Sequence, residues 1–184
     1  MPRLCLCLCV VFLLVSFNVY PQSHVPVAGE SKVEFKIRNF GFNVNGKFGG
    51  LAGKIVFDPA SLSGSGINVS IDANSIDTDN NTRDNHLRKE DYFDVKNYPR
   101  IQFVSTKIAN GKKSGDFVIT GKLTIKKTTR EISFPFTAKS LTNGYRLKGE
   151  FKINRRDFGV GGNSTVSDNL LVCLDVVTRK SEDK

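Results

Sequence analysis

The feature that most constrains this chain is an alternation of apolar and polar residues that recurs along most of its length. A period of two is typical of β-strands that are buried on one face only. Val33, Phe35 and Ile37, for example, alternate with charged residues. Such runs occur at 33–37, 55–57, 67–73, 101–103, 117–125, 132–138, 147–153 and 170–178. The sequence therefore predicts an all-β domain of eight strands.

Turn signals between these runs indicate how the strands connect. Asn110-Gly111 and Asn143-Gly144 each lie between two alternating segments, and Asn-Gly is a strong hairpin signal. Strands joined by short turns form an antiparallel meander. Because each strand buries one face, the sheet must pack against a second sheet or close on itself. A closed barrel of eight strands is just wide enough to be filled by side chains or to hold one small ligand.

One polar segment, residues 78–96, has no period of two. Residues 83–89 are predicted to form a short helix, with Thr82 as its N-cap. The apolar side chains expected to anchor this helix to the barrel are Leu87, Tyr92 and Phe93.

The N-terminal residues predict an export signal. Residues 4–17 form an almost uninterrupted apolar run after Arg3, and this run is shorter than the roughly 20 residues that span a bilayer. We therefore expect a signal peptide at 1–22 and one domain at 23–184, with a retained membrane anchor as the alternative. Of the four cysteines, only Cys173 lies outside the signal. The mature chain then has no internal disulfide and no cysteine pair for zinc.

Charge and composition argue against several functional classes. The net charge is +9, which favours an anionic partner or simply solubility. The basic residues are dispersed, which argues against a nucleic-acid-binding arm. The chain has two histidines and no Gly-x-Ser-x-Gly motif. A calcium loop would start at Asp77, but Thr82 replaces its glycine and Arg88 its final glutamate. We expect no enzyme, no metal and no cofactor.

The inward positions of the predicted strands are almost all Phe, Ile, Val or Leu. Any cavity inside the sheet should therefore be apolar and suited to a long hydrocarbon chain, whose burial yields about 0.8 kcal/mol per methylene. The alternative is that these side chains simply fill the core, and the pattern leaves both open. The predicted cavity residues are Phe35, Ile37, Phe40, Phe42, Phe48, Ile55, Phe57, Val69, Ile71, Ile101, Phe103, Phe117, Ile119, Leu123, Phe134, Phe136, Leu147, Phe151 and Phe158.

Several spaced motifs add a family resemblance. They are Ser-Ile-Asp-Thr at 75–78, Arg-Asp-Asn-His-Leu-Arg at 83–88, Asp-Tyr-Phe-Asp-Val at 91–95, Gly-Lys-Leu-Thr-Ile at 121–125, Ile-Ser-Phe-Pro-Phe at 132–136 and Ile-Asn-Arg-Arg-Asp-Phe-Gly-Val at 153–160. Together, over about residues 29–178, they resemble the YceI family of bacterial polyisoprenoid-binding proteins. True lipocalins are a poorer match, because their Gly-x-Trp signature is impossible in a chain without Trp.

The resemblance implies a lipocalin-like antiparallel barrel in the periplasm, with secretion as the alternative location. It implies non-enzymatic binding of a polyisoprenoid, an isoprenoid quinone or a fatty chain. The motifs at 83–88 and 154–158 are interpreted as structural locks near the cavity mouth. Asp84 is expected to pair with Arg88 one turn later, and Asp157 with Arg155.

Two further predictions concern the mouth of the barrel. The glycine-rich segment 46–53 is predicted to form a flexible rim. Basic residues near the mouth are expected to attract a polar head group, and these are Lys47, Arg83 and Arg88.

A second hypothesis is a filled β-domain that binds a protein or a polysaccharide through its outer surface. It rests on three apolar residues predicted to point outward from the last strand, which would equally suit a homodimer contact: Leu171, Cys173 and Val177. Inward-facing Val172 and Leu174 follow from the same alternation. We expect contact with a membrane to be peripheral at most.

Overall fold

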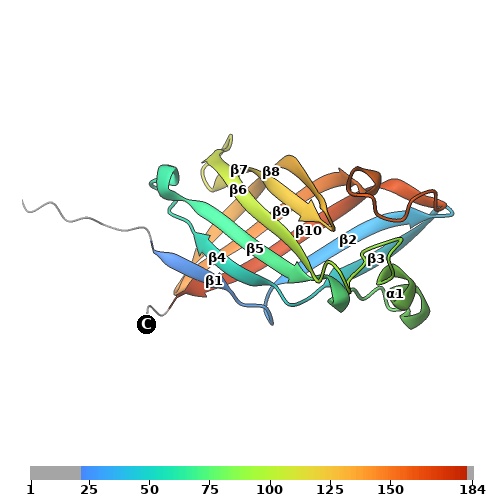
Figure 1. Ribbon diagram of the computed structural model, residues 1–184. Coiled ribbons are helices and arrows are strands. Elements are labelled where there is room, and N and C mark those ends of the chain that lie inside the picture. The colour runs from blue at the N-terminus through green and yellow to red at the C-terminus, as the bar shows by residue number, and fades with distance from the viewer. Residues whose placement is uncertain (1–21, 182–184) are drawn as a thin grey trace, which may run out of the picture.

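A computed structural model describes residues 22–181, and its ten strands form one antiparallel sheet (Figure 1). The strands are β1 (Ser23–Pro26), β2 (Lys32–Asn39), β3 (Phe42–Phe48), β4 (Ala52–Val56), β5 (Gly66–Asp72), β6 (Arg100–Asn110), β7 (Asp116–Ile125), β8 (Thr128–Leu141), β9 (Gly144–Asn154) and β10 (Val166–Lys180). The helices are α1 (Asn81–Leu87) and the short 3-10 turns η1 (Leu62–Gly64), η2 (Ala73–Ser75) and η3 (Arg155–Phe158).

The sheet closes because β10 pairs on one side with two successive strands. Its later part pairs with β1, with Pro26 opposite Thr178, and its earlier part pairs with β2, with Val33 opposite Leu174. β3 and β4 pair with β2 and β1 in the same way. Two barrel strands are therefore each built from two consecutive segments: one from β1 and β2, the other from β3 and β4. The ten segments thus make eight barrel strands. The predicted eight-stranded antiparallel barrel with one helix is confirmed.

The predicted flexible rim at 46–53 is wrong. Gly46 lies within β3 opposite Phe35, and Gly53 lies within β4 opposite Val69. A side chain at Gly46 would overlap the Phe35 ring, which occupies the inner face at this point. β3 therefore has an inward position without a side chain, and this gap in the alternation concealed the strand in the sequence.

The barrel is filled at the end where β1 lies. Phe57 is buried there and makes edge-on contacts with Phe117, Phe136 and Tyr145, at ring-centroid distances of 5.1, 5.9 and 5.2 Å. The predicted cavity residues Phe57 and Phe117 belong to this plug and do not line the cavity described below. Alternation shows that a side chain points inward, but it does not show at which level of the barrel it lies. We call this the closed end.

The opposite end of the barrel is covered by α1 and the segment that follows it (Figure 1). The side chain of Asn80, and not that of Thr82 as predicted, accepts a hydrogen bond from the Arg83 N–H and caps α1. The predicted anchors are confirmed, because Tyr92 and Phe93 pack against buried residues of the barrel and Leu87 faces its interior. No helix within residues 22–181 is long and apolar enough to span a bilayer.

His24 at the closed end makes folding stability dependent on pH. Its side chain is 3% exposed and packs edge-on against Tyr145, with 5.3 Å between ring centroids. Burial lowers the pKa of His24 below the ordinary value of 6.5, and the nearby Lys180 lowers it further. The unfolded chain therefore binds a proton at a higher pH than the folded chain. Stability is present above about pH 6.5 and is lost as the pH falls towards the folded pKa.

We expect the urea midpoint of the protein to be lower at pH 5.5 than at pH 7.5, with a loss of at most about 1.4 kcal/mol per pH unit. In this interval the unfolded carboxylates are already ionised, so they contribute little to the change. The variant His24→Gln is expected to show no such loss between the two pH values. An equal loss in the variant would contradict the assignment to His24.

Candidate ligand-binding cavity

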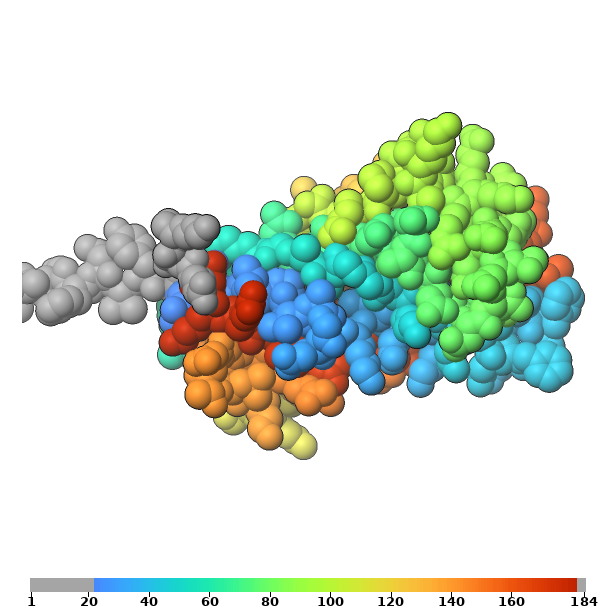
Figure 2. All heavy atoms as spheres, turned by 90° about the horizontal axis from the view of Figure 1, so that it is seen from below, coloured from blue at the N-terminus to red at the C-terminus, as the bar shows by residue number. Residues whose placement is uncertain are grey.

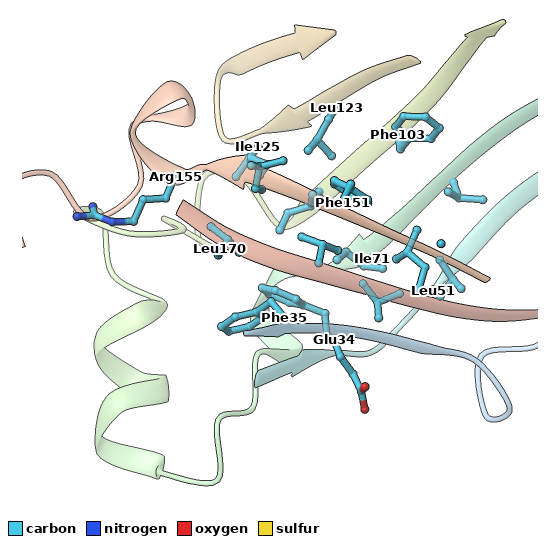
Figure 3. A pocket seen from close by; sticks show the side chains of 18 of the residues that line it. Glu34, Phe35, Leu51, Ile71, Phe103, Leu123, Ile125, Phe151, Arg155 and Leu170 are labelled. Carbon is cyan, nitrogen blue, oxygen red and sulfur yellow. The ribbon is translucent and has the colours of Figure 1, made fainter. Parts of the chain in front are cut away.

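Between the closed end and the segment around α1, the barrel encloses a cavity of about 270 Å³. This volume lies just below the range of about 300–1,000 Å³ found for ligand pockets. Figure 3 shows side chains that surround this space from several strands, among them Phe35 of β2, Phe103 of β6 and Phe151 of β9. Glu34 points away from it. The walls are apolar because alternation places one face of every strand inside.

Most of the predicted cavity residues line this space. They are Phe35, Ile37, Phe48, Ile55, Val69, Ile71, Ile101, Phe103, Ile119, Leu123, Phe134, Phe136, Leu147 and Phe151. Val172 and Leu174 also face inward from β10, as the alternation predicts. Contact of these residues with a ligand stays a prediction.

Three other predicted residues lie elsewhere. Phe40 and Phe42 are 75% and 77% exposed at the turn between β2 and β3. Phe42 continues the inward alternation of β3, whereas Phe40 lies in the turn and is out of phase with Phe35 and Ile37. At the hairpin tip neither side chain lines the cavity. Phe158 is buried in η3 and packs in the core cluster with Val160. It supports the barrel end without lining the cavity.

Sequence reasoning missed part of the lining. Val33, Ile67, Ile125 and Ile153 stand at inward positions of predicted strands, so the alternation itself could have identified them. Leu170 and Val176 likewise stand at inward positions of the predicted run 170–178. The remaining missed residues come from the overlooked β3, from the loop before β4, from the region of α1, and from the loop after η3 and the start of β10; they include Val44, Leu51, Leu87, Tyr92, Phe93, Val160 and Val166. The sequence predicted Leu87, Tyr92 and Phe93 as anchors of the helix, but it gives no local signal that these segments line the cavity.

Of the three predicted head-group residues, only Arg83 lines the cavity. Its Nε donates to Oγ1 of Thr78 at 2.7 Å, and its Nη2 donates to the Thr78 carbonyl at 2.6 Å. These bonds hold the guanidinium at the α1 end of the cavity. No hydrogen bond joins its Nη1 to a protein acceptor within residues 22–181.

Lys47 and Arg88 serve a different purpose. Lys47 pairs with Asp77 at 3.1 Å, and this carboxylate raises the pKa of Lys47. Arg88 donates to the carbonyls of Asn74 and Ile76. Neither cation lines the cavity, and both brace the segment before α1.

The predicted pair of Asp84 with Arg88 is wrong. Oδ1 of Asp84 is buried and accepts bonds from the backbone N–H and the hydroxyl of Thr78 instead. Asp84 therefore fixes the turn that leads into α1, and Thr78 links it to Arg83. This hydrogen-bonded group supports the interpretation of the 83–88 motif as a structural lock.

Arg155 organises the loop between η3 and β10. Its side chain is 5% exposed, and its guanidinium reaches the loop side of the barrel in Figure 3. It donates to the carbonyls of Val160, Gly162, Ser164, Val166 and Ser167. It also pairs with Asp168 at 3.0 Å, whereas the sequence predicted Asp157 as its partner. One arginine thus holds the whole loop against the end of the barrel.

The outer face of β10 is less apolar than predicted. Val177 is buried, and its backbone bonds to Val27 and to the hydroxyl of Ser31 place the β1–β2 connection beside it. The Sγ of Cys173 contacts a carboxylate oxygen of Glu150 at 3.4 Å. Burial raises the pKa of this thiol, and Glu150 raises it further. Only Leu171, which is half-buried, remains as an outward apolar group of the three.

A comparison with known protein families assigns the chain to one of them. The model of the YceI-like domain matches residues 26–178. The chain belongs to the YceI family. Among curated relatives, this YceI protein is 33% identical over 141 residues to a UPF0312 protein of Shewanella denitrificans, which covers 71% of each chain. It is 35% identical over 146 residues to one of Pseudomonas savastanoi, which covers 75% of each.

Solved structures of three bacterial proteins are similar to it. BcnA of Burkholderia cenocepacia matches with a TM-score of 0.76 and 27% identity, over 81% of this chain and 96% of that one. The YCEI protein of Campylobacter jejuni matches with a TM-score of 0.68 and 28% identity, over 77% and 87%. A polyisoprenoid-binding domain of Saccharophagus degradans shares the fold, with a TM-score of 0.72 and 14% identity, over 87% and 99%.

Within residues 22–181, no group of three or more His, Cys, Asp or Glu side chains is placed to hold a metal ion.

Replacing Arg155 tests its role as the lock of this loop. Arg155→Ala is expected to lower the free energy of unfolding by about 3–5 kcal/mol, because it leaves buried acceptors without their shared donor. The neighbouring Arg156 is half-exposed and bonds to the same Asp168 at 2.6 Å, so Arg156→Ala is expected to cost less than about 1 kcal/mol. Urea unfolding measures both, and equal losses would contradict the role assigned to Arg155.

Proposed function

We propose that this protein is a non-enzymatic carrier that holds a long apolar molecule inside its barrel. The observation that carries the proposal is a closed barrel whose cavity is lined by apolar side chains from β2 to β10. The ligand classes are a polyisoprenoid, an isoprenoid quinone or a fatty chain. The description of the Saccharophagus domain as polyisoprenoid-binding supports this choice, and so does membership of the YceI family.

The energetics favour a long ligand. Ten buried carbons yield roughly 8 kcal/mol at about 0.8 kcal/mol per methylene. Association costs about 4–15 kcal/mol in lost freedom, so a short chain binds weakly. A longer chain adds buried surface without adding another such cost. The carrier should therefore prefer chains that occupy the whole cavity.

We place the carrier in the periplasm. The support is the signal peptide predicted at residues 1–22, which lies outside the described residues except for its last position. A carrier in this compartment would move a water-insoluble molecule between membranes or store it. The outer-surface hypothesis has lost part of its basis, since Val177 is buried.

Native mass spectrometry tests the proposal directly. Protein purified from its own periplasm is expected to carry an added mass that matches an isoprenoid or another long-chain lipid. Purified protein incubated with isoprenoid quinone or prenyl phosphate is expected to take up one molecule. Protein that is recovered empty and takes up neither compound would overturn the carrier function.

Two neighbouring residues of β10 provide a matched pair of variants. Val172 lines the cavity, whereas Leu171 lies on the outer face. Val172→Trp is expected to lower ligand affinity at least about tenfold, because the indole takes up space that the ligand needs. Leu171→Trp is expected to bind normally. Titration of ligand, with circular dichroism to confirm folding, checks both variants, and equal affinities would contradict binding in this cavity.

The head group is tested at Arg83. Arg83→Gln is expected to lower the affinity for a prenyl phosphate roughly tenfold, because a hydrogen bond to a charged group contributes about 1.5–3 kcal/mol. The affinity for an uncharged isoprenoid quinone should stay the same. Lys89→Gln, an exposed change in the same segment, is the control. Equal losses for both ligands would show that Arg83 shapes the site without contacting the head group.

A further inference from the structure

The tip of the β2–β3 hairpin carries two exposed aromatic side chains. Phe40 and Phe42 are 75% and 77% exposed, well above the other exposed large apolar residues, Leu141 at 41% and Val118 at 37%. The hairpin projects at the end of the molecule opposite β1 (Figures 1 and 2). A compact apolar projection of this kind marks a contact with a membrane or with another protein.

The backbone at this tip does not explain why phenylalanine is there. Asn39 pairs with Phe42, which leaves a two-residue turn of Phe40 and Gly41. Both turn residues have positive φ, 49° and 84°. A turn with this geometry favours Asn, Asp or Gly, and a bulky residue at positive φ is strained. Phe40 therefore has an unfavourable backbone conformation and an unfavourable exposure at the same time.

The tip also continues the lining of the cavity. Ile37 of β2 and Val44 of β3 pair with each other and both line the cavity. Phe42 stands two residues from Val44 and so lies on the same face of β3. An apolar surface thus runs from the cavity wall along the hairpin to the exposed tip.

The charge of the hairpin suits an anionic surface. Between Phe35 and Phe57 the chain has four basic residues and no acidic one. Lys36 and Arg38 are exposed and have no ion-pair partner within residues 22–181. At the adjacent start of β10, Asp168 is neutralised by Arg155 and Arg156. Aromatic groups that enter the interface and nearby cations that face anionic lipids are the two components of peripheral membrane binding.

We propose that the tip formed by Phe40, Gly41 and Phe42 inserts into the interface of an anionic lipid bilayer and brings the cavity to the membrane surface. Lys36 and Arg38 then face the lipid head groups. Membrane binding itself does not require the proposed carrier function. Only the transfer of a ligand along the hairpin rests on that function.

A single tryptophan reports on the insertion, because the chain has none of its own. Phe42→Trp is expected to show emission at shorter wavelength, and quenching by lipids brominated on their acyl chains, when phosphatidylglycerol vesicles are added. Phosphatidylcholine vesicles should have a weaker effect. Leu141→Trp is the matched control, because Leu141 is an exposed apolar residue at the closed end. It stands beside the turn at Asn143, whose carbonyl accepts a hydrogen bond from the N–H of Lys180. The emission of Leu141→Trp should not change.

Two outcomes of this experiment would overturn the proposal. One is an unchanged Phe42→Trp emission, or an equal change in both variants. The other is a shift that appears without vesicles and grows with protein concentration, which would assign the tip to contact with a second copy of the chain.

A second experiment separates membrane binding from a structural role of Phe40. Phe40→Asn places a favoured residue in the turn, so its thermal midpoint should rise. Its binding to phosphatidylglycerol vesicles, measured by flotation, should fall, and Phe40→Asn with Phe42→Asn should reduce it at least about tenfold. A lower thermal midpoint with unchanged flotation would show that Phe40 serves the fold alone and would overturn the proposal.

The cavity variant Val172→Trp keeps the two proposals distinguishable. It should float with vesicles as the unmodified protein does, whether or not the cavity binds a ligand. Protein that floats but takes up no lipid would contradict the carrier function alone. Protein that takes up lipid from solution but does not float would contradict the membrane contact alone.

Discussion

The structure depends on the pairing of β10 with β1 and β2, because this pairing closes the sheet. β10 is 15 residues long, and its edge is shared by two shorter strands that follow one another in the chain. Closure leaves the central strands without free edges and gives the sheet an inside. The alternation of each strand then has a single consequence, which is an apolar interior and a polar exterior.

The interior is divided along the barrel axis. At the closed end, Phe57 and its aromatic partners fill the space between the walls. Farther along, β2 pairs with β10 on one side and with β3 on the other. Within residues 22–181, the other edge of β3 pairs only through a bridge between Lys47 and Asp77. The wall is therefore completed there by the segment around α1. The closed end supplies a packed core, and the other end supplies the cavity.

The polar side chains at the cavity end form hydrogen bonds mainly with backbone groups. Arg155 satisfies carbonyls of the loop before β10, and Asp84 with Thr78 fixes the turn before α1. A barrel end assembled from loops has many carbonyl and N–H groups that strand pairing cannot satisfy. These side chains supply the missing partners, which explains why the most polar motifs of the chain lie beside its most apolar cavity.

Much of the cavity wall could be predicted, since alternation correctly placed residues such as Phe35, Phe103 and Phe151 inside. The errors have identifiable causes. Phe57 and Phe117 point inward but at another level of the barrel. Phe42 continues the alternation of β3 past the end of the cavity, Phe40 lies in the turn, and Gly46 interrupts the alternation of a strand. Thr82 and Asn80 are both good N-caps by residue type, and only the backbone at residues 79–81 decides between them.

The sequence by itself determined the β-strands, the inward and outward faces, the helical interruption and the motifs of the YceI family, because all of these depend on residues close together in the chain. The tertiary structure alone decided the closure between β1 and β10, the level of each inward side chain, the partners of Arg155 and the exposure of the hairpin tip. These features depend on pairs such as Pro26 with Thr178, which lie far apart in the chain. A local pattern does not indicate which distant strand will pair with a given strand.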